Sequence, residues 1–151
     1  MQPSIVEKEG FTVVGLKARC KGGETGDIPQ LWNRLMERMG EIEGLQEESA
    51  AYGVMTDYDE DTGQYDYIAA FAVHEARDVP EGMVSVEIPP QTYAVFTATM
   101  PTLEETYETI FERWLPQAEY EHAPGPEFEL YPPTFDPQDA DSQLEIYIPI
   151  V

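Results

Sequence analysis

Residues 128–131 read Phe-Glu-Leu-Tyr, and residues 144–150 read Leu-Glu-Ile-Tyr-Ile-Pro-Ile. In both runs apolar side chains alternate with glutamate or tyrosine, which predicts two β-strands because successive side chains of a strand point to opposite faces. One face of each strand would belong to a hydrophobic core. The other face would carry two acid–aromatic pairs, Glu129 with Tyr131 and Glu145 with Tyr147. A carboxylate beside aromatic rings suits a flat or cationic organic ligand, although the same side chains also occur on ordinary solvent-exposed sheet faces.

The composition indicates one globular domain with an unusual charge. The chain has 151 residues, of which 42% are hydrophobic, and its 30 acidic and 8 basic residues give a net charge of −22. Such a field repels nucleic acids and anionic membranes, so we expect no direct nucleic-acid partner and no membrane partner. The acidity fits either solubility, including adaptation to a salty cytoplasm, or the steering of cationic ligands.

Motifs for secretion, membrane insertion, metals and nucleotide cofactors are missing from the sequence. Cys20 is the lone cysteine, the N-terminus does not resemble a signal peptide, and no apolar run approaches the roughly 20 residues that span a bilayer. His74 and His122 lack partners at metal-ligand spacing, and no glycine-rich loop has a phosphate-binding ending. We therefore expect a cytoplasmic protein with no metal and no cofactor.

Two short stretches recur in the same order along the chain. Residues 6–7 (Val-Glu) return at 86–87, and residues 35–39 (Leu-Met-Glu-Arg-Met) return at 110–114 as Ile-Phe-Glu-Arg-Trp. The chain therefore reads as a single domain, residues 1–151, that consists of two pseudo-repeats of about 1–80 and 81–151.

Each half is predicted to run strand, helix, strand, strand. The first helix has apolar residues at helical spacing from Ile28 to Met39, with Pro29 in its first turn. The second helix would begin at a capping box from Thr102 to Glu105 and end at Pro116. Strands are also expected at 51–55 and 65–73, joined by a polar hairpin turn at 57–63, and on both sides of Pro89-Pro90, with a loop at 132–142.

This order of elements predicts an α+β fold with an antiparallel sheet and two helices on one of its faces. The opposite face would have no helix to cover it. If an approximate two-fold axis relates the halves, this helix-free face becomes a ligand cleft at their junction.

Several aromatic residues and methionines are candidates for that cleft. On strand 65–73 the set Ile68, Ala70 and Ala72 is small and apolar enough to pack under helices, so Tyr67 and Phe71 would face the cleft. Met55 joins them because a flexible thioether suits a tolerant pocket. Trp32, Met36 and Trp114 fit either the core or the cleft.

The chain resembles the GyrI-like small-molecule-binding domain, which is also the effector-binding half of AraC-type and MerR-type multidrug regulators. The matching pieces are Val86–Pro89, Gln91–Phe96, Glu112–Pro116, Phe128–Tyr131, Glu145–Ile150 and Tyr65–Ala69, which together extend over essentially the whole chain. The resemblance implies paired strand-helix-strand-strand units with a ligand cleft between them. It also implies that Glu129 is the acidic residue that receives flat cationic ligands among aromatic rings. Unlike the regulators, this sequence contains no helix-turn-helix segment and no basic patch, so it resembles the stand-alone members of the family.

The resemblance leaves three functions open. The leading interpretation is binding of hydrophobic or cationic small molecules of the drug or toxin type. Some stand-alone relatives are linked to hydrolysis of strained electrophiles such as cyclopropanoids, for which Glu129, or less directly Glu145, would be the general base. Other relatives protect DNA gyrase, which would make the chain an acidic protein-binding module with a gyrase or a regulator as partner. The sequence leaves the ligand, turnover and the oligomeric state open.

Overall fold

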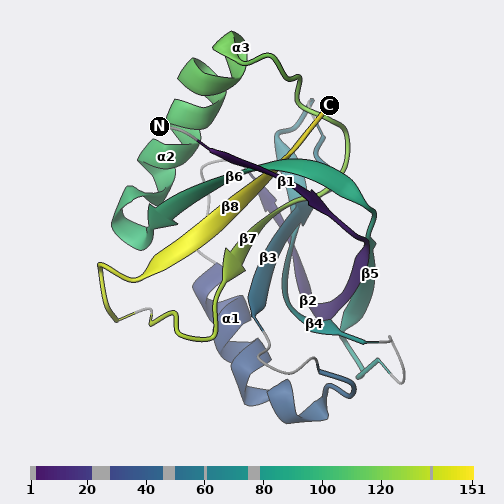
Figure 1. Cartoon of the computed structure of the whole chain (residues 1–151). Coiled ribbons are helices and arrows are strands. Elements are labelled where there is room, and N and C mark those ends of the chain that lie inside the picture. Colours follow the sequence, from purple (N-terminus) through teal and green to yellow (C-terminus); the bar gives the residue numbers. More distant parts are fainter. Residues whose placement is uncertain (1–2, 22–27, 46–49, 60, 75–78, 137) are drawn as a thin grey trace.

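The computed structural model describes residues 3–21, 28–45, 50–59, 61–74, 79–136 and 138–151. These residues form an eight-stranded antiparallel sheet, with helical segments α1 and α2–α3 lying against it (Figure 1). The strands are β1 (Ser4–Lys8), β2 (Phe11–Lys21), β3 (Ala51–Thr56), β4 (Gln64–Val73), β5 (Val84–Ile88), β6 (Gln91–Thr99), β7 (Glu127–Tyr131) and β8 (Gln143–Ile150). The α+β class and the antiparallel sheet are therefore as predicted.

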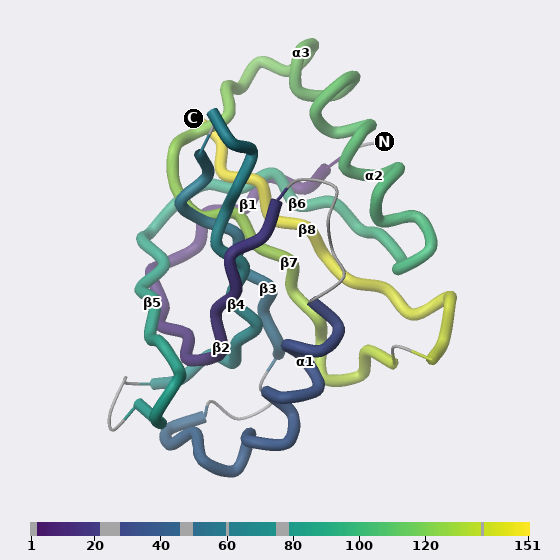
Figure 2. Tube along the Cα trace, turned by 180° about the vertical axis from the view of Figure 1, so that it is seen from behind, coloured from purple at the N-terminus to yellow at the C-terminus, as the bar shows by residue number. Residues whose placement is uncertain are grey.

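The strand order is symmetric about its centre. It runs β1-β6-β8-β7-β3-β4-β2-β5, so that β7 of the second half pairs with β3 of the first. The two outermost strands are exchanged between the halves, because β1 pairs with β6 and β5 pairs with β2. Figure 2 shows both exchanged pairs from behind. The strand that carries Glu129 therefore lies at the junction of the two halves.

The first helical segment follows its apolar spacing. Helix α1 (Ile28–Glu37) buries Leu31 and Leu35, and a short 3-10 turn, η1 (Met39–Glu41), follows it. The second segment is less regular than predicted. It consists of the 3-10 turn η2 (Met100–Thr102), helix α2 (Leu103–Thr109), the π-helical turn η3 (Ile110–Trp114) and α3 (Leu115–Gln117).

The ends of the second segment correct the prediction. The capping box joins Thr99 to Thr102, because the Thr102 hydroxyl accepts a hydrogen bond from the Thr99 backbone N–H at 3.1 Å. It does not join Thr102 to Glu105. Pro116 lies inside α3, which continues directly from η3, and the helix ends one residue later, at Gln117.

Both helices pack on the same face of the sheet, as predicted, and we call this the helix face. The paired residues Phe96, Ile146, Glu129, Gly53, Ala69 and Leu16 form one row on it across β6, β8, β7, β3, β4 and β2. At one end of the row Ala69 packs in the cluster of Leu31 and Leu35 of α1. At the other end Phe96 and Ile146 pack with Ile110 of η3, which continues α2. The row therefore joins the two helix cores, with Glu129 between them.

The opposite face is closed by aromatic rings, and we call it the ring face. Phe128 is fully buried there, with ring centroids 4.6 Å from Tyr147, 5.2 Å from Tyr93, and 5.5 Å from both Tyr52 and Phe11. Phe11 and Tyr93 belong to strands that do not neighbour β7, so the sheet must curve to bring these rings together. The expectation of a ligand cleft on the helix-free face is therefore wrong, because curvature turns that face into a core.

The faces of β4 are also the reverse of the prediction. Tyr67 and Phe71 pack in the α1 cluster, whereas Ile68, Ala70 and Ala72 belong to the ring-face core. Both faces of β4 are apolar, so its composition alone did not indicate which one the helix covers. The other connections are as expected in their described residues. A turn with Gly63 at φ 74° joins β3 to β4, Pro89-Pro90 separates β5 from β6, and the connection after Tyr131 leads to β8, while residues 60 and 137 of the predicted turn and loop lie outside the described part of the chain.

Candidate functional site

Glu129 is a buried carboxylate on the helix face of β7, where it is paired with Gly53 of β3 and with Ile146 of β8. It is 6% exposed. The Tyr131 hydroxyl donates a hydrogen bond of 2.6 Å to its Oε1, and the Tyr107 hydroxyl donates one of 2.7 Å to its Oε2. Among the described residues, no lysine, arginine or histidine lies at ion-pair distance from this carboxylate. The fold therefore buries an acid with two phenol donors and no counter-cation in the described part of the chain.

The electrostatics of the cluster follow from this burial. Desolvation raises the pKa of Glu129, and the hydrogen bonds from Tyr131 and Tyr107 partly oppose that rise because they favour the ionised form. Desolvation and the nearby carboxylate raise the pKa of Tyr107 and of Tyr131, so both phenols keep their protons and act as donors. A positive charge brought to this place would relieve the cost of burying the anion.

Aromatic side chains from the first half of the protein also lie around the carboxylate. The indole N–H of Trp32 on α1 donates a hydrogen bond of 3.0 Å to the Tyr67 hydroxyl. Burial, and next the nearby Glu129 charge, raise the pKa of Tyr67, so this phenol also belongs to the surroundings of the carboxylate. The Trp32 and Tyr131 rings meet edge to face, with centroids 5.6 Å apart, and Phe135 lies edge-on to Tyr131 at 5.0 Å. The carboxylate is thus surrounded by rings from α1, β4, α2, β7 and the connection after β7.

Gly53 makes room for this arrangement. It sits inside β3, opposite Glu129 on one side and Ala69 on the other. A Cβ atom at this position would collide with the Tyr67 hydroxyl, because the phenol crosses β3 on its way to the carboxylate. A glycine inside a strand is unfavourable unless something approaches the backbone closely, and here the Tyr67 side chain does so.

A second carboxylate lies two residues earlier on the same strand face. The side chain of Glu127 is 24% exposed, and its Oε1 lies 3.9 Å from His122 Nε2. Desolvation, with a contribution from the Glu129 charge, raises the pKa of Glu127 to about 7. Burial also lowers the pKa of His122, so both groups are weakly charged near neutrality. The Phe111 ring lies parallel to the Tyr107 ring, with centroids 6.5 Å apart, and edge-on to the His122 ring at 5.6 Å. It therefore lies between the surroundings of Glu129 and those of Glu127.

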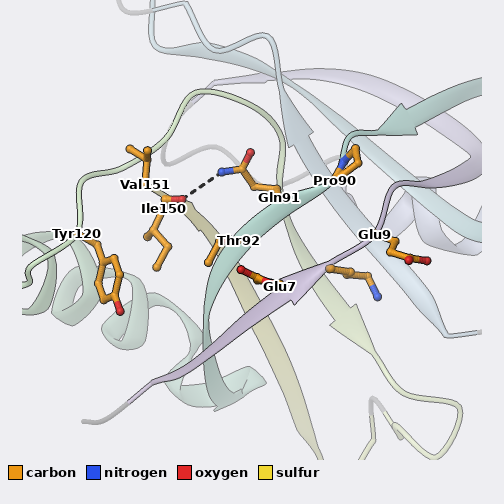
Figure 3. Close-up of a pocket in the computed structure, with 9 residues that line it drawn as sticks. Glu7, Glu9, Pro90, Gln91, Thr92, Tyr120, Ile150 and Val151 are labelled. Carbon is orange, nitrogen blue, oxygen red and sulfur yellow. Dashed lines mark hydrogen bonds between the residues drawn. The ribbon is translucent and has the colours of Figure 1, made fainter.

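An open depression lies elsewhere, along the edge strand β1. It has a volume of about 630 Å³, and Glu7, Glu9 and Thr92 are among its lining residues (Figure 3). The Gln91 amide donates a hydrogen bond of 3.1 Å to the Ile150 carbonyl at its rim. Both glutamates here are exposed. Because the depression is open to solvent, it would desolvate a ligand little, and the ring-enclosed Glu129 is the stronger candidate.

Seven of the predicted site residues fall into three groups. Tyr131, Tyr67 and Trp32 surround Glu129, as described above. Met55, Phe71 and Trp114 lie on the helix face but in its cores: Met55 and Phe71 pack in the α1 cluster, and Trp114 lies edge-on to Phe96 at 5.2 Å. Met36 is 59% exposed on α1.

Glu145 and Tyr147 do not share a face with Glu129, contrary to expectation. The register pairs Tyr147 with Phe128 and Ile146 with Glu129, so the acid–aromatic sides of β7 and β8 point in opposite directions. Tyr147 belongs to the ring-face core, and burial followed by the Glu145 charge raises its pKa to about 12. Alternation within one strand cannot reveal this, because a shift of one residue in the register exchanges the faces.

Tyr107 is the contact of the carboxylate that the sequence analysis did not single out. Its helical spacing indicates an apolar stripe that packs on the sheet, and it does face the sheet. The sequence signal for its role is that a buried tyrosine hydroxyl needs a hydrogen-bond partner, which an aliphatic residue in the same stripe would not need.

The sequence profile of the family described as "GyrI-like small molecule binding domain" matches residues 1–151. The chain belongs to this family. The transcriptional regulator BrlR of Pseudomonas aeruginosa is 39% identical over 154 residues, an alignment that covers 99% of this chain and 56% of BrlR. The chain thus spans about half the length of that relative.

Solved structures of this family's fold superpose over nearly the whole chain. SAV2435 bound to tetraphenylphosphonium matches with a TM-score of 0.78 and 19% identity, covering 100% of this chain and 94% of SAV2435. The C-terminal domain of EcmrR matches with a TM-score of 0.77 and 16% identity, covering 99% of this chain and 97% of that domain. At these identities the two matches establish the fold that the GyrI-like chain adopts.

Two further observations bear on the site and on its setting. Within the described ranges, no three His, Cys, Asp or Glu side chains gather in an arrangement that could hold a metal ion. Among the helices of those ranges, none combines the length and the apolar character needed to cross a bilayer.

Proposed function

We propose that this GyrI-like domain binds lipophilic organic cations, with Glu129 as the charge partner. The observation that carries the proposal is a carboxylate that is 6% exposed and has phenol hydroxyls as its partners among the described residues. Burying an anion without a cation is unfavourable, so a bound cation gains both the direct attraction and the relief of that cost.

The rings supply the second part of the recognition. Trp32, Tyr67, Tyr107 and Tyr131 surround the carboxylate with aromatic surface, and ring faces attract cations by roughly 0.5–2 kcal/mol each. A ligand that reaches the carboxylate must separate some of these rings. Trp32 and Tyr131 are partly exposed and meet edge to face, so they are the rings best placed to open. Ring contacts impose loose shape requirements, which favours a range of ligands over a single one.

The relatives support the chemistry and suggest a setting. SAV2435, with the same fold, was solved with tetraphenylphosphonium, a lipophilic cation. BrlR is a transcriptional regulator, and this chain corresponds to about half of it. We infer that the domain receives a ligand rather than contacting DNA, because a net charge of −22 repels the phosphate backbone.

The test compares two ions of the same shape and opposite charge. Isothermal titration calorimetry of the wild-type chain with tetraphenylphosphonium and with tetraphenylborate is carried out at 0.15 M and 0.5 M NaCl. The comparison separates the contribution of the buried carboxylate to affinity from that of the acidic surface. Salt screens the surface field but has little effect on a buried pair, so preference for the cation should persist at 0.5 M. Equal binding of both ions at high salt would rule out the proposed role of Glu129.

Hydrolysis of a reactive small molecule is the second candidate for the same site. The raised pKa of Glu129 makes it a stronger general base than an exposed carboxylate. Both carboxylate oxygens already accept hydrogen bonds, so the base would have to exchange a phenol for water before it could act. Mass-spectrometric detection of a product that the wild type forms and Glu129→Gln does not would support this role, and turnover by both proteins would exclude it.

A further inference from the structure

The ring-walled site continues along β7 to Glu127. Residues two apart on a strand point to the same face and lie about 7 Å apart along it, so Glu127 is the neighbour of Glu129 on the helix face. The parallel rings of Tyr107 and Phe111 run alongside, and Phe111 is 36% exposed. Glu129 is buried at one end of this arrangement, whereas Glu127 and Phe111 at the other end are in contact with solvent.

The two carboxylates differ in how completely they are satisfied. Glu129 accepts a hydrogen bond on each oxygen. Glu127 has no hydrogen-bond donor among the described side chains, and its nearest basic group is His122 at 3.9 Å, which is beyond hydrogen-bonding distance. The Glu127 side chain is three-quarters buried, but its carboxylate has no protein donor among the described residues and reaches solvent, so a positive group from outside can approach it.

We propose that the cation site is selective for dications. One positive charge of the ligand pairs with Glu129 and the other pairs with Glu127, and the Tyr107 and Phe111 rings contact the ligand between its two charges. This inference rests on the proposed function, because it extends the Glu129 site. The spacing of about 7 Å along the strand predicts ligands whose two charges are separated by one aromatic ring.

The test uses a matched pair of quaternary ammonium ions. p-Xylylene-bis(trimethylammonium) carries two charges across one ring, and benzyltrimethylammonium carries one. Isothermal titration at pH 8 and 0.15 M NaCl gives the ratio of dication to monocation affinity for the wild type, for Glu127→Gln and for the control Glu87→Gln. Glu87 is exposed on the edge strand β5, so its substitution removes the same charge away from the site.

The ratio should fall about tenfold in Glu127→Gln, a value between those of exposed and fully desolvated ion pairs. In Glu87→Gln it should stay within twofold of the wild type. An unchanged ratio in Glu127→Gln overturns the inference while leaving tetraphenylphosphonium binding, and so the proposed function, intact. Failure of the wild type to bind tetraphenylphosphonium and both ammonium ions overturns the two together.

A measurement on the wild type alone covers the case in which Glu127→Gln does not fold. The groups that face Glu127 are Glu129 on its own strand, Tyr107 on α2 and His122 after α3. Between pH 6 and pH 8 Glu127 loses its proton and His122 loses any remaining charge, and both changes favour an external cation at Glu127. The dication preference should therefore rise severalfold over this range, because the titration of Glu129 cancels in the ratio. A pH-independent ratio contradicts the inference.

Discussion

Replacing Glu129 with glutamine should weaken tetraphenylphosphonium binding about 30-fold. The phenyl groups keep the phosphonium charge roughly 6 Å from a carboxylate, and at an effective dielectric constant of about 20 the attraction is about 3 kcal/mol. Desolvation of the ion offsets part of this, which leaves about 2 kcal/mol for the charge itself. Ring contacts are retained in the variant, so binding should weaken rather than vanish.

The same substitution should change stability little. Glutamine keeps one acceptor oxygen, so the hydroxyl of either Tyr107 or Tyr131 must find another acceptor, at a cost of about 1 kcal/mol. Against this, the variant no longer buries a carboxylate whose pKa is raised by desolvation. We expect the free energy of unfolding at pH 7.5 to stay within about 1 kcal/mol of the wild type, so that affinity is compared between equally folded proteins.

Isothermal titration at pH 7.5 and 0.15 M NaCl measures the effect, with Glu87→Gln as the charge-matched control. The control should bind within twofold of the wild type, because Glu87 is exposed at the edge of the sheet. If Glu129→Gln bound tetraphenylphosphonium within threefold of the wild type, the buried carboxylate would not be the charge partner, and the reasoning from its burial would be refuted.

Gly53→Ala should lower the free energy of unfolding by about 1–3 kcal/mol in urea titration, because the new methyl group meets the Tyr67 hydroxyl; an unchanged midpoint would contradict the close approach. The Glu127 carboxyl has a native pKa of about 7 against 4.5 when exposed, so its contribution to stability is full below pH 4.5 and is lost as the pH rises through 7. Relative to the wild type, Glu127→Gln should therefore gain about 2–3 kcal/mol between pH 5 and pH 8, and equal pH slopes of the two proteins would disprove this. Tyr131→Phe removes a donor that favours ionised Glu129, so the pKa of Glu129 should rise further and tetraphenylphosphonium affinity should start to fall at a higher pH than in the wild type. Identical pH profiles of affinity for the two proteins would argue against that role of the hydroxyl.

The sequence predicts the elements of this fold well, because most of them depend on local patterns. Alternation along β7 places Phe128 and Glu129 on opposite faces, and the structure has them there, one in the ring-face core and one between the helices. The proline pair at 89–90 separates β5 from β6 as expected. These features are determined within a few residues of chain.

Features that depend on pairing between distant segments could not be predicted from local sequence patterns. The register of β7 on β8 sends Tyr147 to the ring face, although its local pattern matches that of Tyr131. The curvature that fills the ring face arises from the whole sheet, so the helix-free face looked open from the sequence. Gly53 was the overlooked local signal, since a glycine inside a strand indicates that another group comes close to the backbone.

A crystal structure of the chain with tetraphenylphosphonium tests the central claim most directly. The account predicts the phosphorus atom within about 6 Å of the Glu129 carboxylate, with phenyl groups against the rings of Trp32, Tyr107 and Tyr131. It also predicts that at least one of the phenol hydrogen bonds to Glu129 is lengthened or broken. A ligand seated instead in the open depression beside Glu7 and Glu9, with the Glu129 cluster unchanged, would contradict it.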